Sequence, residues 1–343
     1  MKRNQAAWVS VRAVAAAAAV ASMAAGAAGC GGGGGSAALK MLPSDTKVVV
    51  GVDLNKARGT GVWETGTDVL RSLAKDDTVG GSLDKVKETL KDFEKKTGMD
   101  PVNDLTYVIF GFAEVKGDLQ GAAIITSKTD LDEDAIFDFM EEETGSDLDK
   151  DEVKGMKVYS DTKGNGSYCL FDKRTFVMGD HDWVDSMVEL KNGKGKSAGD
   201  NKELAAAMKK VEGGAAVWFA AGVDDDLQDE LRDTPVKGLD DATDFTGAVT
   251  LTKGIKAALR IGFAKKEDAE DVAGKLEDFA KGTKKMAKAM SEGMPFMKDL
   301  LEAYKIEAKG TDAVVTVDVG EETVDDIAKW LKKDGKSFLP AML

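Results

Sequence analysis

The sequence predicts an α+β protein of two modules, each a largely antiparallel sheet with helices packed on one side. Three observations support this prediction. Short runs of alternating apolar and polar residues, typical of strands, lie between longer stretches of helical period. Short turns join most neighbouring strands, and the repeated strand-helix-strand alternation of a parallel sheet is missing. The order of elements also recurs in the two halves of the 343-residue chain.

In the first half, a strand is followed by a helical region that breaks near Gly80-Gly81 and restarts at Ser82, a suitable N-cap. A hairpin, a helix capped by Thr129 or Asp130, three short strands and a last helix complete this half. The expected ranges are 47–54 (strand), 62–96 (helical), 106–114 and 121–127 (hairpin), 129–143 (helix), 156–160, 167–171 and 175–179 (strands), and 182–190 (helix).

The second half repeats this order after a Gly-rich linker at 192–199. The best local match joins residues 177–185 with 317–325, where a strand enters a helix. A diverged duplication and a shared local pattern both account for the match. The expected ranges are 201–210 (helix), 215–221 (strand), 224–232 (helix), 243–252 and 255–263 (hairpin), 266–290 and 295–304 (helices), 305–308 and 313–319 (strands), and 323–331 (helix).

The first 30 residues are typical of an export signal. Lys2, Arg3 and Arg12 precede an almost wholly apolar stretch from Ala13 to Ala28, and small residues lead into Ala27-Ala28-Gly29-Cys30. This segment resembles the lipobox of bacterial lipoproteins. The resemblance implies that residues 1–29 are a signal peptide that is removed, and that Cys30 receives a diacylglyceryl group and a further acyl chain such as palmitate.

Residues 30–40 are expected to form a lipidated tether, because the glycine run 31–35 cannot offset its own ordering entropy. Acyl chains on Cys30 would then be the membrane contact. Gly31 is not the Asp that retains many lipoproteins at the inner membrane, so the family rule implies an outer-membrane location where the host has one. Two alternatives are a cleaved signal before a chance cysteine and a transmembrane anchor, for which about 16 small apolar residues are too few.

The body is predicted to comprise modules 41–199 and 200–343. Its opening Leu42-Pro43-Ser44-Asp45-Thr46, followed by a strand, resembles exported lipoproteins of tandem α+β build, and the resemblance implies no particular activity. The net charge of -14 and the aromatic content of 6% disfavour a nucleic-acid partner, which would require phosphate neutralisation and base stacking.

The residues for common catalytic chemistries are scarce. His181 is the one histidine, and no Gly-x-Ser-x-Gly turn accompanies it, so a solvent-facing role is expected. Cys169 lies in a strand-like run and is expected to be buried. One His and one unlipidated Cys exclude a zinc enzyme. Gly195-Lys196-Ser197 follows a helix and lacks the first glycine of a phosphate loop. No cofactor or metal is therefore expected.

Acidic residues at 130, 132, 134, 138 and 141 match the spacing of a calcium loop, but Ala135 stands where that loop needs glycine. These acids are instead expected to cap a helix, with Ile136 and Phe137 on its apolar face. Alternating acids at 147, 149 and 151 lack both the glycine and the closing Glu, which leaves only weak divalent-ion binding open there.

A methionine-rich segment offers a possible apolar ligand surface, because flexible thioethers accept varied shapes. The alternative is that these residues belong to the buried stripe of a long helix. The residues concerned are Met286, Met290, Met294, Met297 and Phe296.

Three function classes remain from the sequence. A lipid-anchored, non-enzymatic envelope protein with a binding or structural role is the main hypothesis. A carrier or chaperone of an apolar ligand such as lipid is the alternative. A hydrolase that uses only carboxylates is third, because the 61 acidic residues indicate no particular pair.

Overall fold

The computed structural model describes residues 37–73, 80–115, 118–164, 166–211, 213–290, 294 and 296–333. Within this part the chain divides into two compact units, each described by itself below. The first unit contains residues 37–55 and 80–201, and the second contains residues 56–73 and 202–333. Cys30 and the leader lie outside the described residues.

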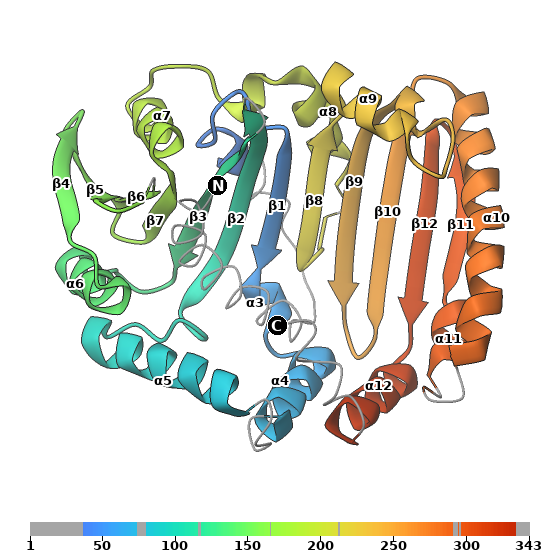
Figure 1. Ribbon diagram of the computed structural model, residues 1–343, viewed down its shortest axis with the longest axis horizontal. Coiled ribbons are helices and arrows are strands. Elements are labelled where there is room, and N and C mark those ends of the chain that lie inside the picture. Colours follow the sequence, from blue (N-terminus) through green and yellow to red (C-terminus); the bar gives the residue numbers. More distant parts are fainter. Residues whose placement is uncertain are drawn as a thin grey trace. The chain divides into compact units, whose positions relative to one another are not determined.

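The first unit is built on an antiparallel sheet (Figure 1). Neighbouring strands pair through apolar residues such as Ile109 and Ile124, and alternation places one set of side chains on each face. The strand order is β1 (Val48–Asp53), β2 (Leu105–Val115), β3 (Asp118–Ser127), β7 (Thr175–Asp180), β6 (Gly166–Asp172), β5 (Met156–Asp161) and β4 (Leu148–Val153).

Helices pack on both faces of this first sheet. On one face, Phe137 of α6 stacks on Tyr159 with ring centroids 3.6 Å apart. On the other, His181 at the start of α7 contacts Ser167, and Lys191 at its end lies over the Phe171 ring. The helices are α5 (Gly80–Thr97), α6 (Glu133–Thr144), α7 (His181–Lys191) and the short 3-10 helix η1 (Ala198–Asp200), while α3 (Leu54–Ala57) joins the two units in sequence.

The second unit repeats the antiparallel arrangement with five strands in the described part of the chain. Its hairpin is closed by Lys253-Gly254, and its strand order, read from β8, follows the same connections as β1-β2-β3-β7-β6 of the first unit. The strands are β8 (Val217–Gly222), β9 (Ala242–Leu251), β10 (Ile255–Phe263), β12 (Asp312–Val319) and β11 (Tyr304–Lys309).

One face of the second sheet carries most of its helices. Val272 of α10 packs with Ile261 and Ala313, and Val324 of α12 packs with Val319. On the opposite face, Lys210 of α8 forms ion pairs with Asp244 and Asp312. The helices are α4 (Gly61–Leu73), α8 (Lys202–Lys210), α9 (Asp225–Arg232), η2 (Leu239–Asp241), α10 (Lys266–Met290), α11 (Met297–Glu302) and α12 (Glu321–Lys333).

The α+β class with two antiparallel modules is confirmed, and three details differ from the expectation. Strand β4 was not expected, because four of its six residues are charged; it forms as a hairpin with β5 through Lys154 and Gly155, whose positive φ angles of 53° and 84° suit a tight hairpin turn. Helix α4 belongs to the second unit rather than to the first module, since it packs against α12. Helices pack on both sides of each sheet rather than on one side. In the first unit α7 lies on the face opposite α6, and in the second unit α8 lies on the face opposite α10.

Candidate functional site

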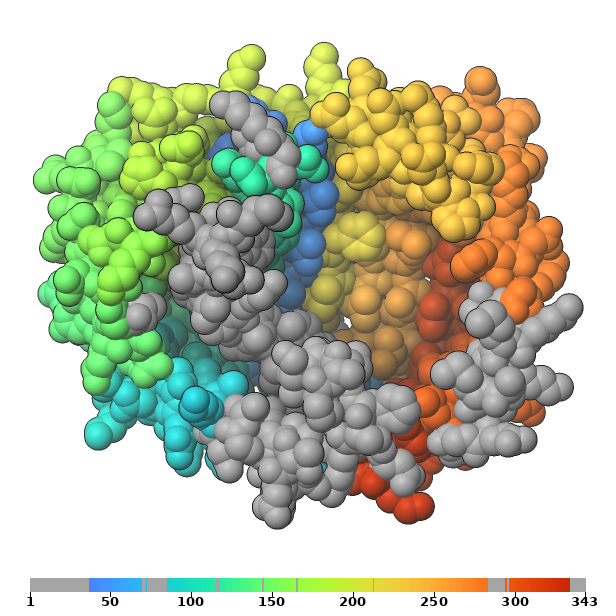
Figure 2. All heavy atoms as spheres, viewed as in Figure 1, coloured from blue at the N-terminus to red at the C-terminus, as the bar shows by residue number. Residues whose placement is uncertain are grey.

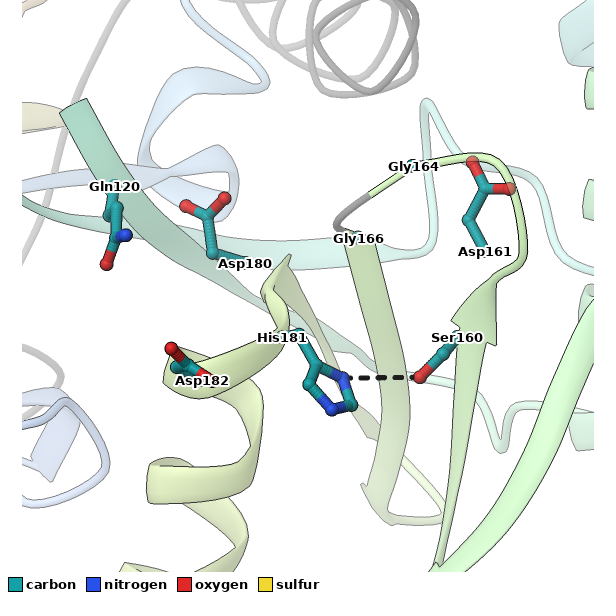
Figure 3. Close-up of a pocket in the computed structure, with 8 residues that line it drawn as sticks. All are labelled: Gln120, Ser160, Asp161, Gly164, Gly166, Asp180, His181 and Asp182. Atoms are coloured by element: carbon teal, nitrogen blue, oxygen red, sulfur yellow. Dashed lines mark hydrogen bonds between the residues drawn. The ribbon is translucent and has the colours of Figure 1, made fainter. Parts of the chain in front are cut away.

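A polar hollow of about 360 Å³ opens at one end of the first sheet (Figure 3). Strands β3, β5, β6 and β7 and the first turn of α7 contribute its walls, so rigid elements position the side chains. The side chains and backbone that line it are those of Gln120, Ser160, Asp161, Gly164, Gly166, Asp180, His181 and Asp182. The lining is wholly polar apart from glycine, with three carboxylates, one amide, one hydroxyl and one imidazole.

His181 is the centre of a hydrogen-bonded network in this hollow. Its Nδ1 lies 2.7 Å from the hydroxyl of Ser167 and 3.4 Å from that of Ser160, and the two hydroxyls are 2.9 Å apart. On the other side of the ring, Nε2 lies 3.7 Å from a carboxylate oxygen of Asp185, one helical turn later. The network ties the start of α7 to strands β5 and β6.

Sequence reasoning missed Ser160 and Ser167 as neighbours of His181. They come together because β5 and β6 pair in a register that places Ser160 opposite Ser167. The alternating pattern of these strands predicts which face each serine occupies, but the register itself depends on the turn that joins them.

The network contains the residue types of a serine hydrolase but not its geometry. Ser167, which makes the shortest bond to His181, is fully buried and cannot be reached by a substrate. Ser160 lies at the outer limit of hydrogen bonding from the imidazole, and Asp185 lies beyond it. A nucleophile and its base need a bond of about 2.6–3.2 Å, with a third group orienting the base.

Asp180 lines the hollow and links β7 to β3. One of its carboxylate oxygens accepts a 2.7 Å hydrogen bond from the backbone N–H of Gly121. Burial raises the pKa of Asp180 above its ordinary value, and the nearby Asp182 carboxylate raises it further, while the bond from Gly121 opposes both.

One further sequence expectation for the first unit is confirmed and one is corrected. Cys169 is buried, and burial raises the pKa of its thiol to about 11, so the thiolate is disfavoured at neutral pH. The cap of α6 is neither Thr129 nor Asp130 but Asp132, whose carboxylate accepts a 3.1 Å bond from Ala135 N–H. Asp130 instead pairs with Arg174 at 2.8 Å. No group of three or more metal-ligating side chains comes together in the described residues.

The methionine-rich segment is only partly described. Met286 and Met290 fall in the last turns of α10, where the side chains lie outside the described residues. Met294 and Met297 are half-buried, and Phe296 is buried in edge-to-face contact with Trp330, with ring centroids 5.5 Å apart. Phe296 therefore packs within the protein, and the proposed ligand surface along these methionines stays a prediction.

The second unit presents a different apolar surface, which we name the apolar floor. It lies on the face of the sheet that also carries α9 and α10, and Figure 2 shows atoms of β8, β9 and β10 at the base of a hollow bordered by these helices. Its side chains share a sheet face yet are only half-buried. They are Val217, Phe219, Val249, Ala257, Leu259, Val315 and Val317.

A glycine shapes the centre of the apolar floor. Gly247 is paired in register with Phe219 on one side and Leu259 on the other. The Phe219 ring lies across Gly247 so closely that no Cβ fits at this position. The ring lies over the backbone of the neighbouring strand and does not project from the sheet. Aromatic side chains commonly cover a cross-strand glycine in this way. No charged residue is among the side chains of the floor.

Comparison with known proteins finds similarity only at the level of structure. No protein-family model matches the sequence, and no curated protein matches it. Two crystal forms of TP0453 are similar in structure. Form III has 7% identity and a TM-score of 0.42, covering 85% of this chain and 97% of TP0453; form IV has 8% and 0.41, covering 84% and 96%. We transfer no function from this similarity.

Proposed function

We propose that the chain is a lipid-anchored, non-enzymatic protein of the cell envelope that binds an apolar or amphipathic partner on the apolar floor of its second unit. The observation that carries the proposal is the incomplete burial of seven apolar side chains on one face of four neighbouring strands. Contiguous apolar surface of this kind marks interaction sites in soluble domains, because leaving it in water is unfavourable.

The anchor in this proposal rests on the sequence. The lipobox-like segment ending at Cys30 supports acylation, and the glycine run after it supports a tether between membrane and body. None of the helices in the described part of the chain is both long and apolar enough to cross a membrane. Replacing Cys30→Ser in the full chain is expected to move the protein from the membrane fraction to the soluble fraction. Retention of the variant in the membrane after a carbonate wash would overturn the anchor.

The non-enzymatic part rests on the polar hollow. Its one imidazole bonds most closely to a serine that substrate cannot reach, and that bond serves to hold α7 on the sheet. A carrier of apolar ligands such as lipid is the second candidate, favoured by the absence of charge from the side chains of the floor. Native mass spectrometry of protein extracted from its own membrane distinguishes a co-purifying lipid from a polypeptide partner.

A charge placed on the floor tests the binding proposal. In the full chain carrying Cys30→Ser, Leu259→Lys is expected to weaken binding of the neutral probe Nile red about tenfold, which corresponds to about 1.4 kcal/mol. The reason is that the probe would have to desolvate the new ammonium group. Val102→Lys, on an exposed side chain of the first unit, is the matched control and should leave binding unchanged. Thermal unfolding of both variants checks that they are folded. Equal Nile red binding by wild type and a folded Leu259→Lys variant would contradict the proposal.

A further inference from the structure

The apolar floor has a strongly acidic border. The segment 224–241, which we name the acidic lip, contains helix α9 and η2 and borders the hollow seen in Figure 2. Eight of its side chains are acidic and two are basic. The acids are Asp224, Asp225, Asp226, Asp229, Glu230, Asp233, Asp240 and Asp241, and the bases are Arg232 and Lys237.

Packing of α9 leaves these charges at the surface. Leu227 and Leu231 pack on the core of the second unit, and none of the residues of α9 is fully buried. Arg232 is shared between Asp229, at 2.5 Å, and Asp240, at 3.7 Å. One guanidinium therefore offsets only part of the negative charge of the lip.

The start of α10 adds more acidic than basic side chains. Residues 265–275 contain four acids, Glu267, Asp268, Glu270 and Asp271, and three lysines, of which Lys266 pairs with Glu270 and Lys275 with Asp271. The border of the apolar floor that the acidic lip and the start of α10 form is thus net negative, and such a border selects ligands by the sign of their charge.

We propose that the acidic lip makes the apolar floor a site for a basic amphipathic peptide helix. This inference rests on the proposed function, which supplies the floor. Four strands about 4.8 Å apart give a floor about 14 Å wide, which accommodates a helix of about 10–12 Å diameter. An apolar helix face fits the floor while its lysines or arginines approach the lip, the usual helix-in-groove arrangement. A lipid with an anionic headgroup meets repulsion at the same lip.

Two synthetic 18-residue helices test the inference. Both carry the same leucine face, and one carries lysine and the other glutamate on the polar face. By fluorescence anisotropy with the full chain carrying Cys30→Ser, the lysine peptide is expected to bind at least tenfold more tightly at low salt. The preference should shrink as salt rises, because exposed charges are screened.

Matched variants test whether the acidic side chains of the lip cause the preference for the lysine peptide. Asp225→Asn combined with Asp229→Asn and Glu230→Gln is expected to weaken the lysine peptide several-fold while leaving Nile red binding unchanged. The control makes three equivalent changes on exposed β4 of the first unit, Asp149→Asn, Asp151→Asn and Glu152→Gln, and should leave both unchanged.

The outcomes separate the two proposals. Equal binding of both peptides, with Nile red binding intact, overturns the acidic lip as a selector and leaves the binding function standing. Stronger binding to phosphatidylglycerol vesicles than to the lysine peptide overturns the peptide partner in favour of a lipid. If the wild type binds neither Nile red nor either peptide, the floor itself is not a binding surface and both proposals fail.

Discussion

Strands β3 and β7 of the first unit and strands β10 and β12 of the second occupy equivalent places in the two sheets, yet they are covered differently. On the face of the first sheet that packs α6, the side chains of β3 and β7 are buried, whereas their counterparts in the second sheet are half-exposed. The buried set is Ala123, Ile125, Phe176 and Met178, and the half-exposed set is Ala257, Leu259, Val315 and Val317.

The difference in burial follows from the elements that each unit adds to the strand order that the two units share. The first unit has the extra hairpin β4–β5, which supplies Tyr159, and α6 supplies Phe137. These two rings stack, and the Phe137 ring also lies 6.1 Å from that of Phe176, centroid to centroid. The described part of the second unit has no counterpart of this hairpin. One arrangement of strands can therefore give a closed aromatic core in one unit and an open floor in the other.

The largest change in stability is expected when a side chain is removed from the aromatic core of the first unit. Phe137→Ala should lower the free energy of unfolding by about 3–5 kcal/mol, because it leaves a cavity among buried rings. Leu259→Ala on the floor should cost less, about 1.5 kcal/mol, since its side chain is only partly buried. Urea unfolding followed by circular dichroism measures both. Equal losses for the two variants would show that the floor is packed as tightly as the core.

The cross-strand glycines give the next largest effect. A Cβ at Gly121 would lie 2.5 Å from the carbonyl oxygen of Gly111, and backbone cannot move aside cheaply. Gly121→Ala should therefore cost about 1–3 kcal/mol. At Gly247 the obstacle is only the Phe219 ring, which can rotate off the floor. Gly247→Ala should cost less stability but change Nile red binding. The comparison fails if Gly121→Ala is the milder change.

The sequence predicted those parts of the fold that depend on local pattern. Both long hairpins and the burial of Cys169 follow from alternation and side-chain chemistry. The helix α6 was expected as well, but its cap is Asp132 and not Thr129 or Asp130. Strand β4 was missed because an exposed edge strand can be mostly charged, and pairing with β5 rather than its own composition makes it a strand.

The site depends on facts that a sequence does not carry. Ser160 and Ser167 reach His181 through strand register, and among the described residues no aromatic layer like that of the first unit covers the apolar floor. Alternation shows that Leu259 and Val315 face one side of a sheet, but not whether that side is filled. The methionine segment has an unusual composition that suggested a ligand surface, whereas the floor consists of Phe219 and ordinary aliphatic residues, which carry no such signal.

Two aspartates of the first unit should respond to pH in opposite directions. Burial raises the pKa of Asp180, so between the ordinary value of about 3.9 and its raised value the folded state binds more protons than the unfolded state, and stability falls as pH rises through this window. The bond from Arg174 lowers the pKa of Asp130, so its contribution is present above the ordinary value and is lost as pH falls through the lowered one.

Asp180→Asn should therefore remove part of the loss of stability on going from about pH 4 to pH 7. An asparagine oxygen can still accept the bond from Gly121, so the link between β7 and β3 is kept. The measurement is the urea midpoint at several pH values. Asp130→Asn is the control, because the pKa of Asp130 is lowered rather than raised. This variant should remove a loss of stability that the wild type shows only at acidic pH. A steeper pH dependence in the Asp180→Asn variant would contradict the burial of that carboxyl.

The smallest change in stability is expected at His181, although an imidazole is the side chain most often used in catalysis. The side chain is 52% exposed, and the buried hydroxyl of Ser167 keeps Ser160 as a partner at 2.9 Å when the imidazole is removed. His181→Gln, whose amide can bond to Ser167, should change the free energy of unfolding by no more than about 0.5 kcal/mol. Nile red binding on the second unit should be unchanged. Ser167→Ala is the sensitive control and should cost about 1 kcal/mol, since the hydrogen bonds of a buried hydroxyl are lost. A folded His181→Gln protein that fails in its cell would show that the polar hollow acts in function, and the closed unit would then carry a site of its own.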